Sequence, residues 1–259
     1  MHDERGEWLV KFPSPSRDGI HDVVGLEATC LELARAAKLT VPESHLVSVG
    51  RRRVLLVRRF DVTARGGRFH MVSFRTLCGE RPGLFITEYG ELVQVLRRVS
   101  ASPAADVGAL FRHMVFNAAI GNVDDHLKNF WMLADSNVGY RLAPAFDLVP
   151  DVTERRDHTL AFRSGFGCPT RKVLLELAAA WDISHARDIV EQVIDSVSAF
   201  SKAARRLGVR RPASVRLIAA DVHRRLRLIG SRPRGVSPAV KKRRATSSAC
   251  GASTADPDA

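Results

Sequence analysis

The sequence predicts an α+β protein in which a small unit of strands and one helix precedes a mostly helical part. Strand-like segments occur at residues 7–12, 46–49 and 54–57, and the first of them alternates apolar and polar residues. Apolar residues at helical spacing dominate from residue 88 to residue 229. With 45% hydrophobic and 26% charged residues in a length of 259, the chain has the composition of a globular protein with a sizeable core.

Residues 1–60 are expected to form the N-terminal unit. Its first strand carries Trp8, Val10 and Phe12 on one face, as in a strand with one buried side. Its helix is closed by Pro42. The predicted elements are a strand over residues 7–12, a loop over 13–19, a helix over 22–38, and strands over 46–49 and 54–57.

Residues 61–230 are expected to form the helical part. Leu110, Met114 and Ala118 share one face of a predicted helix that Gly121 would end. From residue 231 to residue 259 small, polar and basic residues dominate, which predicts a disordered tail. The predicted helices cover residues 88–99, 106–120, 170–181, 189–207 and 213–229, and a hairpin joins strands over 130–133 and 140–143.

Positive charge is concentrated near the C-terminal end. Residues 201–244 hold 15 Lys and Arg residues and one acid, Asp221, in a chain of formal net charge +12. This pattern is typical of a solvated basic helix, and it also fits contact with nucleic acid, either directly or beside a partner. A nucleic-acid-binding module is therefore an alternative interpretation, although aromatic residues make up 7% of the chain and no nucleic-acid-binding motif is found.

Membrane and secretory signals are not found in the sequence. No apolar run approaches the ~20 residues that span a bilayer, and no signal-like stretch follows the charged N-terminus. The four cysteines are far apart and lack metal-ligand spacing. We therefore expect a cytoplasmic protein without membrane contact.

The densest polar cluster is the segment Asn122-Val-Asp-Asp-His-Leu-Lys-Asn129, between a predicted helix and a predicted strand. Loops held by rigid elements commonly carry catalytic groups. Within this segment Asp124 precedes Asn129 by five residues, and Asp147 follows Asn129 by 18 residues. The predicted hairpin between them can bring Asn129 and Asp147 side by side.

This spacing matches the needs of phosphoryl transfer from ATP. The reaction uses Mg²⁺, which prefers oxygen ligands, and a carboxylate that orients or deprotonates the accepting hydroxyl. In protein kinases that carboxylate lies five residues before a magnesium-binding Asn, and a second metal-binding Asp follows later. Asp124, Asn129 and Asp147 have this order. Lys11 and Glu27 are candidates for the Lys that holds the phosphates and the Glu that orients it.

Together these segments resemble the C-terminal, kinase-like region of HipA-type serine/threonine kinases, the toxin components of bacterial toxin–antitoxin systems. The most specific string is Gly121-Asn-Val-Asp-Asp-His-Leu-Lys-Asn129 followed by Pro144-Ala-Phe-Asp147. The other segments that carry the resemblance, over roughly residues 7–210, are Trp8-Leu-Val-Lys-Phe-Pro13, Gly25-Leu-Glu27, Leu33-Ala-Arg-Ala-Ala37, Val41-Pro-Glu43 and Arg58-Arg-Phe-Asp61. The resemblance implies a protein-kinase-like α+β fold, with a shortened N-lobe over residues 1–60 and a mostly helical C-lobe over 61–230.

Residue by residue, the resemblance implies a complete Mg-ATP site. Its catalytic residues would be Asp124, which faces the substrate hydroxyl, and Asn129. The remaining roles are Mg²⁺ binding by Asn129 and Asp147, phosphate contact by Lys11 beside Glu27, adenine contact by the backbone of Arg58–Phe60, ribose contact by Asp61, and support of the loop by His126.

The sequence departs from the family at its N-terminal end. Members carry a Gly-rich, phosphate-covering loop before the Lys strand, whereas seven residues precede Trp8 here and Gly6 is their one glycine. We therefore expect an N-terminally truncated member without this loop. It would be a remnant, a pseudokinase that binds ATP weakly, or a chain whose partner supplies the missing segment.

The resemblance also implies partners. It suggests an antitoxin of the HipB type, through which DNA would be contacted, and a protein substrate such as an aminoacyl-tRNA synthetase.

A divalent-metal hydrolase built on Asp124, Asp125, His126 and Asp147 is the other alternative. Adjacent Asp124 and Asp125 rarely point the same way in extended backbone, which weakens this hypothesis. Asp125 is expected to be a surface acid or a brace of the loop, and Asp151 is expected to be structural.

Overall fold

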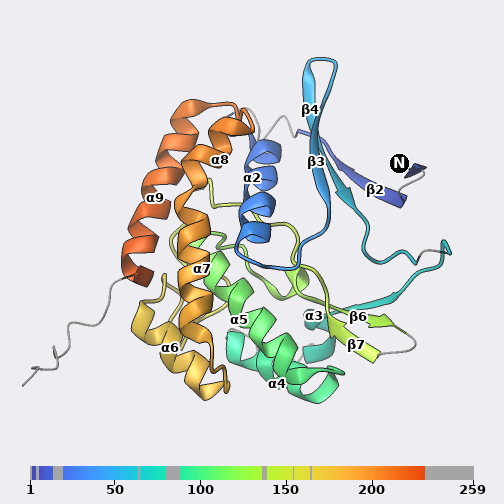
Figure 1. Cartoon of the computed structure of the whole chain (residues 1–259), viewed down its shortest axis with the longest axis vertical. Helices are drawn as coiled ribbons and strands as arrows, with labels where there is room; N and C mark the ends of the chain where they lie inside the picture. Colours follow the sequence, from blue (N-terminus) through green and yellow to red (C-terminus); the bar gives the residue numbers. More distant parts are fainter. Residues whose placement is uncertain are drawn as a thin grey trace, which may run out of the picture.

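The computed structural model describes residues 2–3, 6–13, 20–63, 65–79, 88–135, 139–153, 155–163 and 165–230. Two antiparallel sheets lie on one side of the molecule, and a group of helices fills the other side (Figure 1). The first sheet has the strand order β1-β2-β4-β3, with β1 (His2–Asp3), β2 (Gly6–Lys11), β3 (Ser44–Val49) and β4 (Arg52–Arg58). The second has the order β5-β6-β7, with β5 (His70–Ser73), β6 (Trp131–Asp135) and β7 (Gly139–Leu142).

Helices are the commonest element in the described chain. They are α2 (Val23–Ala36), α3 (Phe74–Cys78), α4 (Tyr89–Val99), α5 (Pro103–Ile120), α6 (Arg171–Ala180), α7 (Ala186–Ser198), α8 (Phe200–Arg206) and α9 (Pro212–Gly230), with a short 3-10 turn, η1 (Leu127–Asn129). This α+β arrangement agrees with the class that the sequence predicts.

Helix α2 packs on the first sheet. Leu26 and Leu31 of α2 are fully buried, as is Leu55 of β4, so the apolar stripe of the helix meets the apolar face of the strands. The helix begins at Asp22, whose side chain accepts a hydrogen bond from the Gly25 amide at 3.1 Å. The apolar spacing predicted this helix correctly.

Helix α5 runs through the middle of the core and ends directly before the polar segment 122–129. Gly121 ends the helix in the left-handed conformation, with φ of +80°. A Cβ at this position would lie 3.0 Å from Nε of Arg225 on α9. Glycine is therefore required both by the backbone conformation and by the close approach of α9.

A buried carboxylate joins α5 to the second sheet. Asp106, in the first turn of α5, accepts hydrogen bonds from Arg141 of β7 at 2.9 Å and from the Leu142 amide at 2.9 Å. Because β7 returns from β6, this contact fixes the hairpin that separates the 122–129 segment from Asp147.

Several elements differ from the sequence prediction. The single helix expected over residues 189–207 is two helices, α7 and α8, that meet at Ala199. Val197 and Phe200 are both buried, so the apolar spacing continues across the break and does not reveal it. Strands β1 and β5 and helix α3 were not predicted, because segments of two to five residues are too short to show a period.

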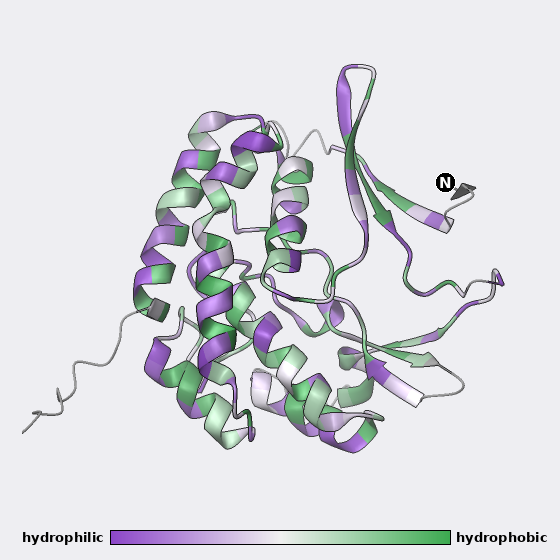
Figure 2. Cartoon of the chain, viewed as in Figure 1, coloured by the Kyte–Doolittle hydropathy of each residue, from purple (hydrophilic) through white to green (hydrophobic). Residues whose placement is uncertain are grey.

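Some predicted segments lie outside the described residues. These are most of the loop 13–19, the centre of the hairpin turn at 136–138 and the tail 231–259. Within the described parts of the chain, no helix is both long and apolar enough to cross a membrane. Figure 2 shows hydrophilic and hydrophobic residues alternating along α9, as in an amphipathic helix with one buried side.

The burial of His113 in α5 should make the folded protein less stable in acid. Burial lowers its pKa from 6.5 to about 4, so the folded state binds fewer protons than the unfolded state in this range. Above pH 6.5 the histidine is neutral in both states, and its burial costs no stability. As the pH falls from 6.5 toward 4, the free energy of unfolding decreases by about 3 kcal/mol. Urea unfolding from pH 7 to pH 4 should show this slope in the wild type and a flatter one in His113→Met. Equal slopes in the two proteins would contradict it.

Candidate active site

Lys11 joins three separate parts of the chain. Its Nζ donates hydrogen bonds to Oε1 of Glu27 on α2 at 2.6 Å and to Oδ1 of Asp147, after β7, at 2.8 Å. The side chain of Glu27 is 5% exposed and that of Asp147 is 49% exposed, so the ammonium lies where a buried wall meets an open cleft. The structure thus brings together three residues separated by up to 136 positions in the sequence.

Electrostatics keep Lys11 charged. Burial lowers its pKa, but the carboxylates of Glu27 and Asp147 outweigh burial, and the net pKa is raised above 10.5. Burial raises the pKa of Glu27 above 4.5, while the Lys11 ammonium opposes this change. Lys11 is therefore a fixed positive charge inside the cleft.

Asp147 is held in an uncommon backbone conformation. Its φ is +55°, in the left-handed region that residues other than glycine seldom adopt. The Ala145 amide donates to the Thr40 carbonyl at 2.8 Å, and Leu148 is fully buried. Anchors on both sides thus turn the Asp147 carboxylate into the cleft toward Lys11. Such local strain is common at functional sites.

The 122–129 loop places its two adjacent acids on opposite sides. The side chain of Asp124 is 59% exposed and lines a cavity, whereas Asp125 is fully buried. The Asn129 side-chain amide donates to the Asp124 carbonyl at 2.8 Å, which leaves its own carbonyl oxygen for a metal. Nε2 of His126 lies 3.9 Å from the Asp124 carboxylate.

Asp125 holds the loop to the core. One carboxylate oxygen accepts hydrogen bonds from the Tyr89 hydroxyl at 2.6 Å and from Nδ1 of His158 at 2.8 Å. The other accepts from the Thr159 amide at 2.8 Å and the Leu160 amide at 3.3 Å. Asp125 is therefore a brace of the loop, one of the two roles expected from the sequence, and its burial excludes the other, a surface acid. Tyr89 and His158 were missed, since each lies among other polar residues in a segment distant from the loop in the sequence.

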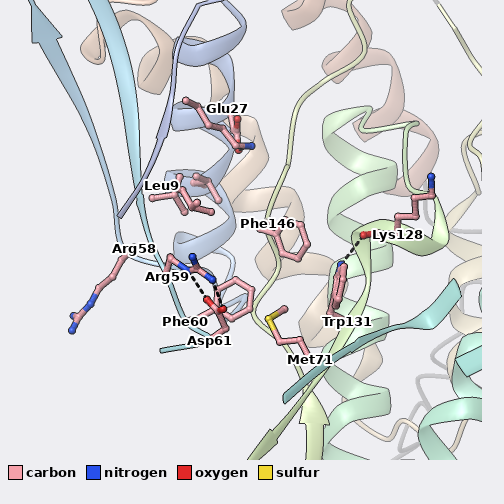
Figure 3. A pocket seen from close by; sticks show the side chains of 13 residues that line it. Leu9, Glu27, Arg58, Arg59, Phe60, Asp61, Met71, Lys128, Trp131 and Phe146 are labelled. Atoms are coloured by element: carbon pink, nitrogen blue, oxygen red, sulfur yellow. Dashed lines mark hydrogen bonds and ion pairs between the residues drawn. The ribbon is translucent and has the colours of Figure 1, made fainter. Parts of the chain in front are cut away.

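A cavity of about 340 Å³ opens beside Lys11 and Glu27. Its apolar lining comes from both sheets and from the segment before Asp147 (Figure 3). The Phe60 and Phe146 rings lie 5.9 Å apart at this cavity. The apolar residues that line it are Leu9, Leu31, Val57, Phe60, Met71, Trp131 and Phe146. A flat aromatic base fits a space with such walls.

Arg58 and Asp61 are placed at the edge of this cavity. Arg58 pairs with Glu43 at 3.2 Å, and its side chain points away from the other lining residues in Figure 3. Asp61 accepts hydrogen bonds from Arg59 at 2.9 Å and 2.5 Å. The Arg59 guanidinium lowers the pKa of the Asp61 carboxyl. Of residues 58–61, Phe60 is the one whose side chain packs against the Phe146 ring.

A second cavity, of about 640 Å³, continues from the first. Lys11 and Glu27 line both cavities, and Asp124 and Asp147 face the second. Arg155 enters it and lies 3.4 Å from the Asp124 carboxylate. Asp151 binds the Thr153 amide and the Arg155 amide, at 3.2 Å and 2.6 Å, as expected of a structural acid.

The donor set of the cleft suits Mg²⁺. Asp147 offers a carboxylate, the kind of oxygen ligand that this ion prefers, and faces the second cavity. Asn129 lines neither of the two cavities, and its side-chain amide contacts the Asp124 carbonyl. The contact between Asp147 and the Lys11 ammonium shows that positive charge is stabilised here. The arrangement does not suit the hydrolase hypothesis, because Asp125 points into the core. Within the described residues, no three His, Cys, Asp or Glu side chains are grouped to hold a metal.

Comparison with known proteins identifies the family and the fold of this chain. The sequence pattern of the HipA-like C-terminal domain matches residues 1–225, and the chain belongs to this family. Two Sinorhizobium fredii proteins named as candidate kinases are similar in sequence. Y4mE is 36% identical over 153 residues and Y4dM 29% identical over 161, covering 56% and 57% of this chain. The matched segments cover 34% and 38% of those relatives, so the chain spans well under their full length.

Solved structures share the fold. The HipA chain of a Shewanella oneidensis complex of HipA, HipB and operator DNA aligns with a TM-score of 0.65 at 19% identity. That alignment covers 86% of this chain and 58% of the other. The Helicobacter pylori proinflammatory kinase CtkA aligns with a TM-score of 0.61 at 14% identity, over 88% and 90% of the two chains. The chain therefore has the kinase-like fold of HipA.

Replacing Tyr89 tests the brace. Tyr89→Phe removes a donor to the buried Asp125 carboxylate and should reduce the free energy of unfolding by about 1–2 kcal/mol. Tyr140→Phe is the matched control, because its hydrogen bond to His70 is exposed, and it should cost less than about 0.5 kcal/mol. Urea denaturation measures both. Equal losses of unfolding free energy would mean that the hydrogen bond to the buried Asp125 stabilises the protein no more than the exposed hydrogen bond of Tyr140 does.

Proposed function

We propose that this chain is a HipA-like serine/threonine protein kinase, which transfers the γ-phosphoryl group of Mg-ATP to a protein hydroxyl. The observation that carries the proposal is the double contact of Lys11 with Glu27 and Asp147, at the junction of two cavities. A fixed ammonium beside a metal-binding carboxylate is the arrangement that phosphate groups need in this reaction.

The residues of the cleft have distinct roles in this proposal. The cavity between Phe60 and Phe146 holds the base, and Lys11 holds the phosphates. Asn129 and Asp147 would hold Mg²⁺, which when bound neutralises charge on the transferred phosphoryl group. Arg58 contributes through its backbone and Asp61 approaches the ribose, as the family resemblance implies.

Asp124 is the residue that acts on the acceptor. Its carboxylate faces the second cavity, where an accepting hydroxyl can reach it from solvent. There it orients or deprotonates that hydroxyl. Arg155, which pairs with Asp124, must release it when the acceptor binds.

Partners are proposed from the family. The Shewanella neighbour is named in complex with HipB and operator DNA, which supports a HipB-type antitoxin as partner of this chain in a bacterial cytoplasm. An aminoacyl-tRNA synthetase is the proposed class of protein substrate. Direct DNA binding by the basic C-terminal segment is less favoured, because Asp221 pairs with Arg224 and Arg225 within α9.

Transfer of labelled γ-phosphate tests the function. With Mg-ATP and a bacterial lysate, the wild type should label itself or a lysate protein, and Asp124→Asn and Asp147→Asn should reduce the rate by roughly 10²-fold or more. Asp182→Asn is the matched control, since its carboxylate is exposed and pairs with Arg97 instead. Equal labelling by all four proteins would remove the assigned residues from catalysis. No labelling by the wild type would favour a pseudokinase.

A further inference from the structure

A line of polar side chains, of which all but the partly exposed Asp221 are buried, connects α9 to the 122–129 loop. Asp221 and Arg225 belong to α9, His158 lies in the segment after Asp151, and Asp125 is in the loop. Nε of Arg225 donates to Asp221 at 2.5 Å, and its Nη1 lies 3.3 Å from Nε2 of His158. Nδ1 of His158 lies 2.8 Å from Asp125. Helix α9 thus reaches a residue that neighbours Asp124.

Arg225 is unusual for its complete burial. It is the largest of the fully buried side chains, in a helix whose other charged residues are partly or fully exposed. An arginine is almost never fully buried unless it is paired. Here Asp221 supplies the pairing carboxylate, and Gly121 leaves room for the guanidinium.

The two neighbours of His158 determine its protonation. A guanidinium has donors and no acceptor, so Nε2 of His158 must accept from Arg225 and carry no proton. An ionised carboxylate has acceptors and no donor, so Nδ1 must carry the proton and donate it to Asp125. The imidazole is therefore neutral, with its proton on Nδ1. This assignment follows from the two partners on opposite sides of the ring.

The backbone beside His158 is joined to the same loop. The Thr159 amide donates to the Val123 carbonyl at 3.0 Å, and the Thr159 hydroxyl donates to that carbonyl at 3.0 Å. Asn129 contacts the Asp124 carbonyl from the other side. Asp124 itself is exposed, so these contacts of its neighbours set where its carboxylate lies.

We propose that Arg225 and His158 are positioning residues for Asp124. Arg225 fixes the Nδ1–H form of His158, which holds Asp125 and with it the 122–129 loop, so that α9 is required for the geometry of the site. This inference rests on the proposed kinase function, and it adds a role for a helix that does not line either cavity.

Nitrogen NMR tests, without any activity measurement, whether Arg225 fixes the Nδ1–H form of His158. In the wild type, ¹⁵N spectra of His158 should show the proton on Nδ1 and none on Nε2. In Arg225→Met, the ring should no longer be confined to this form, and the amide resonances of residues 123–125 should shift. A proton on Nε2 in the wild type, or unchanged loop resonances in the variant, would overturn the proposal.

Kinetic measurements test whether Arg225 and His158 position Asp124 for phosphoryl transfer. Arg225→Met and His158→Leu should lower kcat for phosphoryl transfer by about tenfold to a hundredfold and change KM for ATP by less than about threefold, since misplacement by about 1 Å has effects of this size. His158→Asn keeps a donor for Asp125 and should recover part of kcat. Arg171→Met is the matched control: it removes a buried arginine of α6 that pairs with Glu191 at 2.5 Å and lines neither cavity, and it should leave kcat unchanged.

The outcomes separate the two proposals. A loss of stability without a loss of kcat in Arg225→Met, as in Arg171→Met, would show a purely structural role and overturn the inference. If the wild type transfers no phosphate, the proposed function fails, and the nitrogen and amide spectra then decide whether α9 holds the loop through His158.

Discussion

The contact of one ammonium with two carboxylates organises this molecule. Lys11 lies at the end of an N-terminal strand, Glu27 on the helix behind that strand, and Asp147 beyond the hairpin of the second sheet. A buried carboxylate such as Glu27 is costly without a partner, so the position of Lys11 is strongly constrained. Asp147 is half-exposed, so water weakens its ion pair with Lys11. A bound ligand can therefore replace Asp147 as the partner of the Lys11 ammonium.

The opposite wall of the cleft depends on hydrogen bonds within the core. Asp125 receives two side-chain and two backbone donors, which offset the cost of burying its charge. The same loop leaves its neighbour Asp124 largely exposed, so one backbone segment supplies both a buried anchor and an accessible carboxylate. The two walls meet at the second cavity, where Lys11, Asp124 and Asp147 face a common space.

The sequence predicted the parts of this structure that depend on periodicity and spacing. Most helices and strands were identified, and Lys11, Glu27 and Asp147, chosen for their order along the chain, lie in contact. The break at Ala199 was missed, because Phe200 continues the apolar period into α8. The buried Arg225 was missed within a basic segment interpreted as solvated, since charge patterns do not show which arginine turns inward. Contacts such as His158 with Asp125 join distant single residues and leave no local pattern.

Calorimetric titration with ATP, with and without Mg²⁺, tests the central claim most directly. If Lys11 and Asp147 form the phosphate and metal site, binding will depend on Mg²⁺, and both Lys11→Met and Asp147→Asn will weaken it by about tenfold or more, the loss of at least one charge-assisted contact. The exposed-site variant Asp182→Asn will bind as the wild type does. Binding of ATP that is independent of Mg²⁺ and unchanged in both variants would contradict the account.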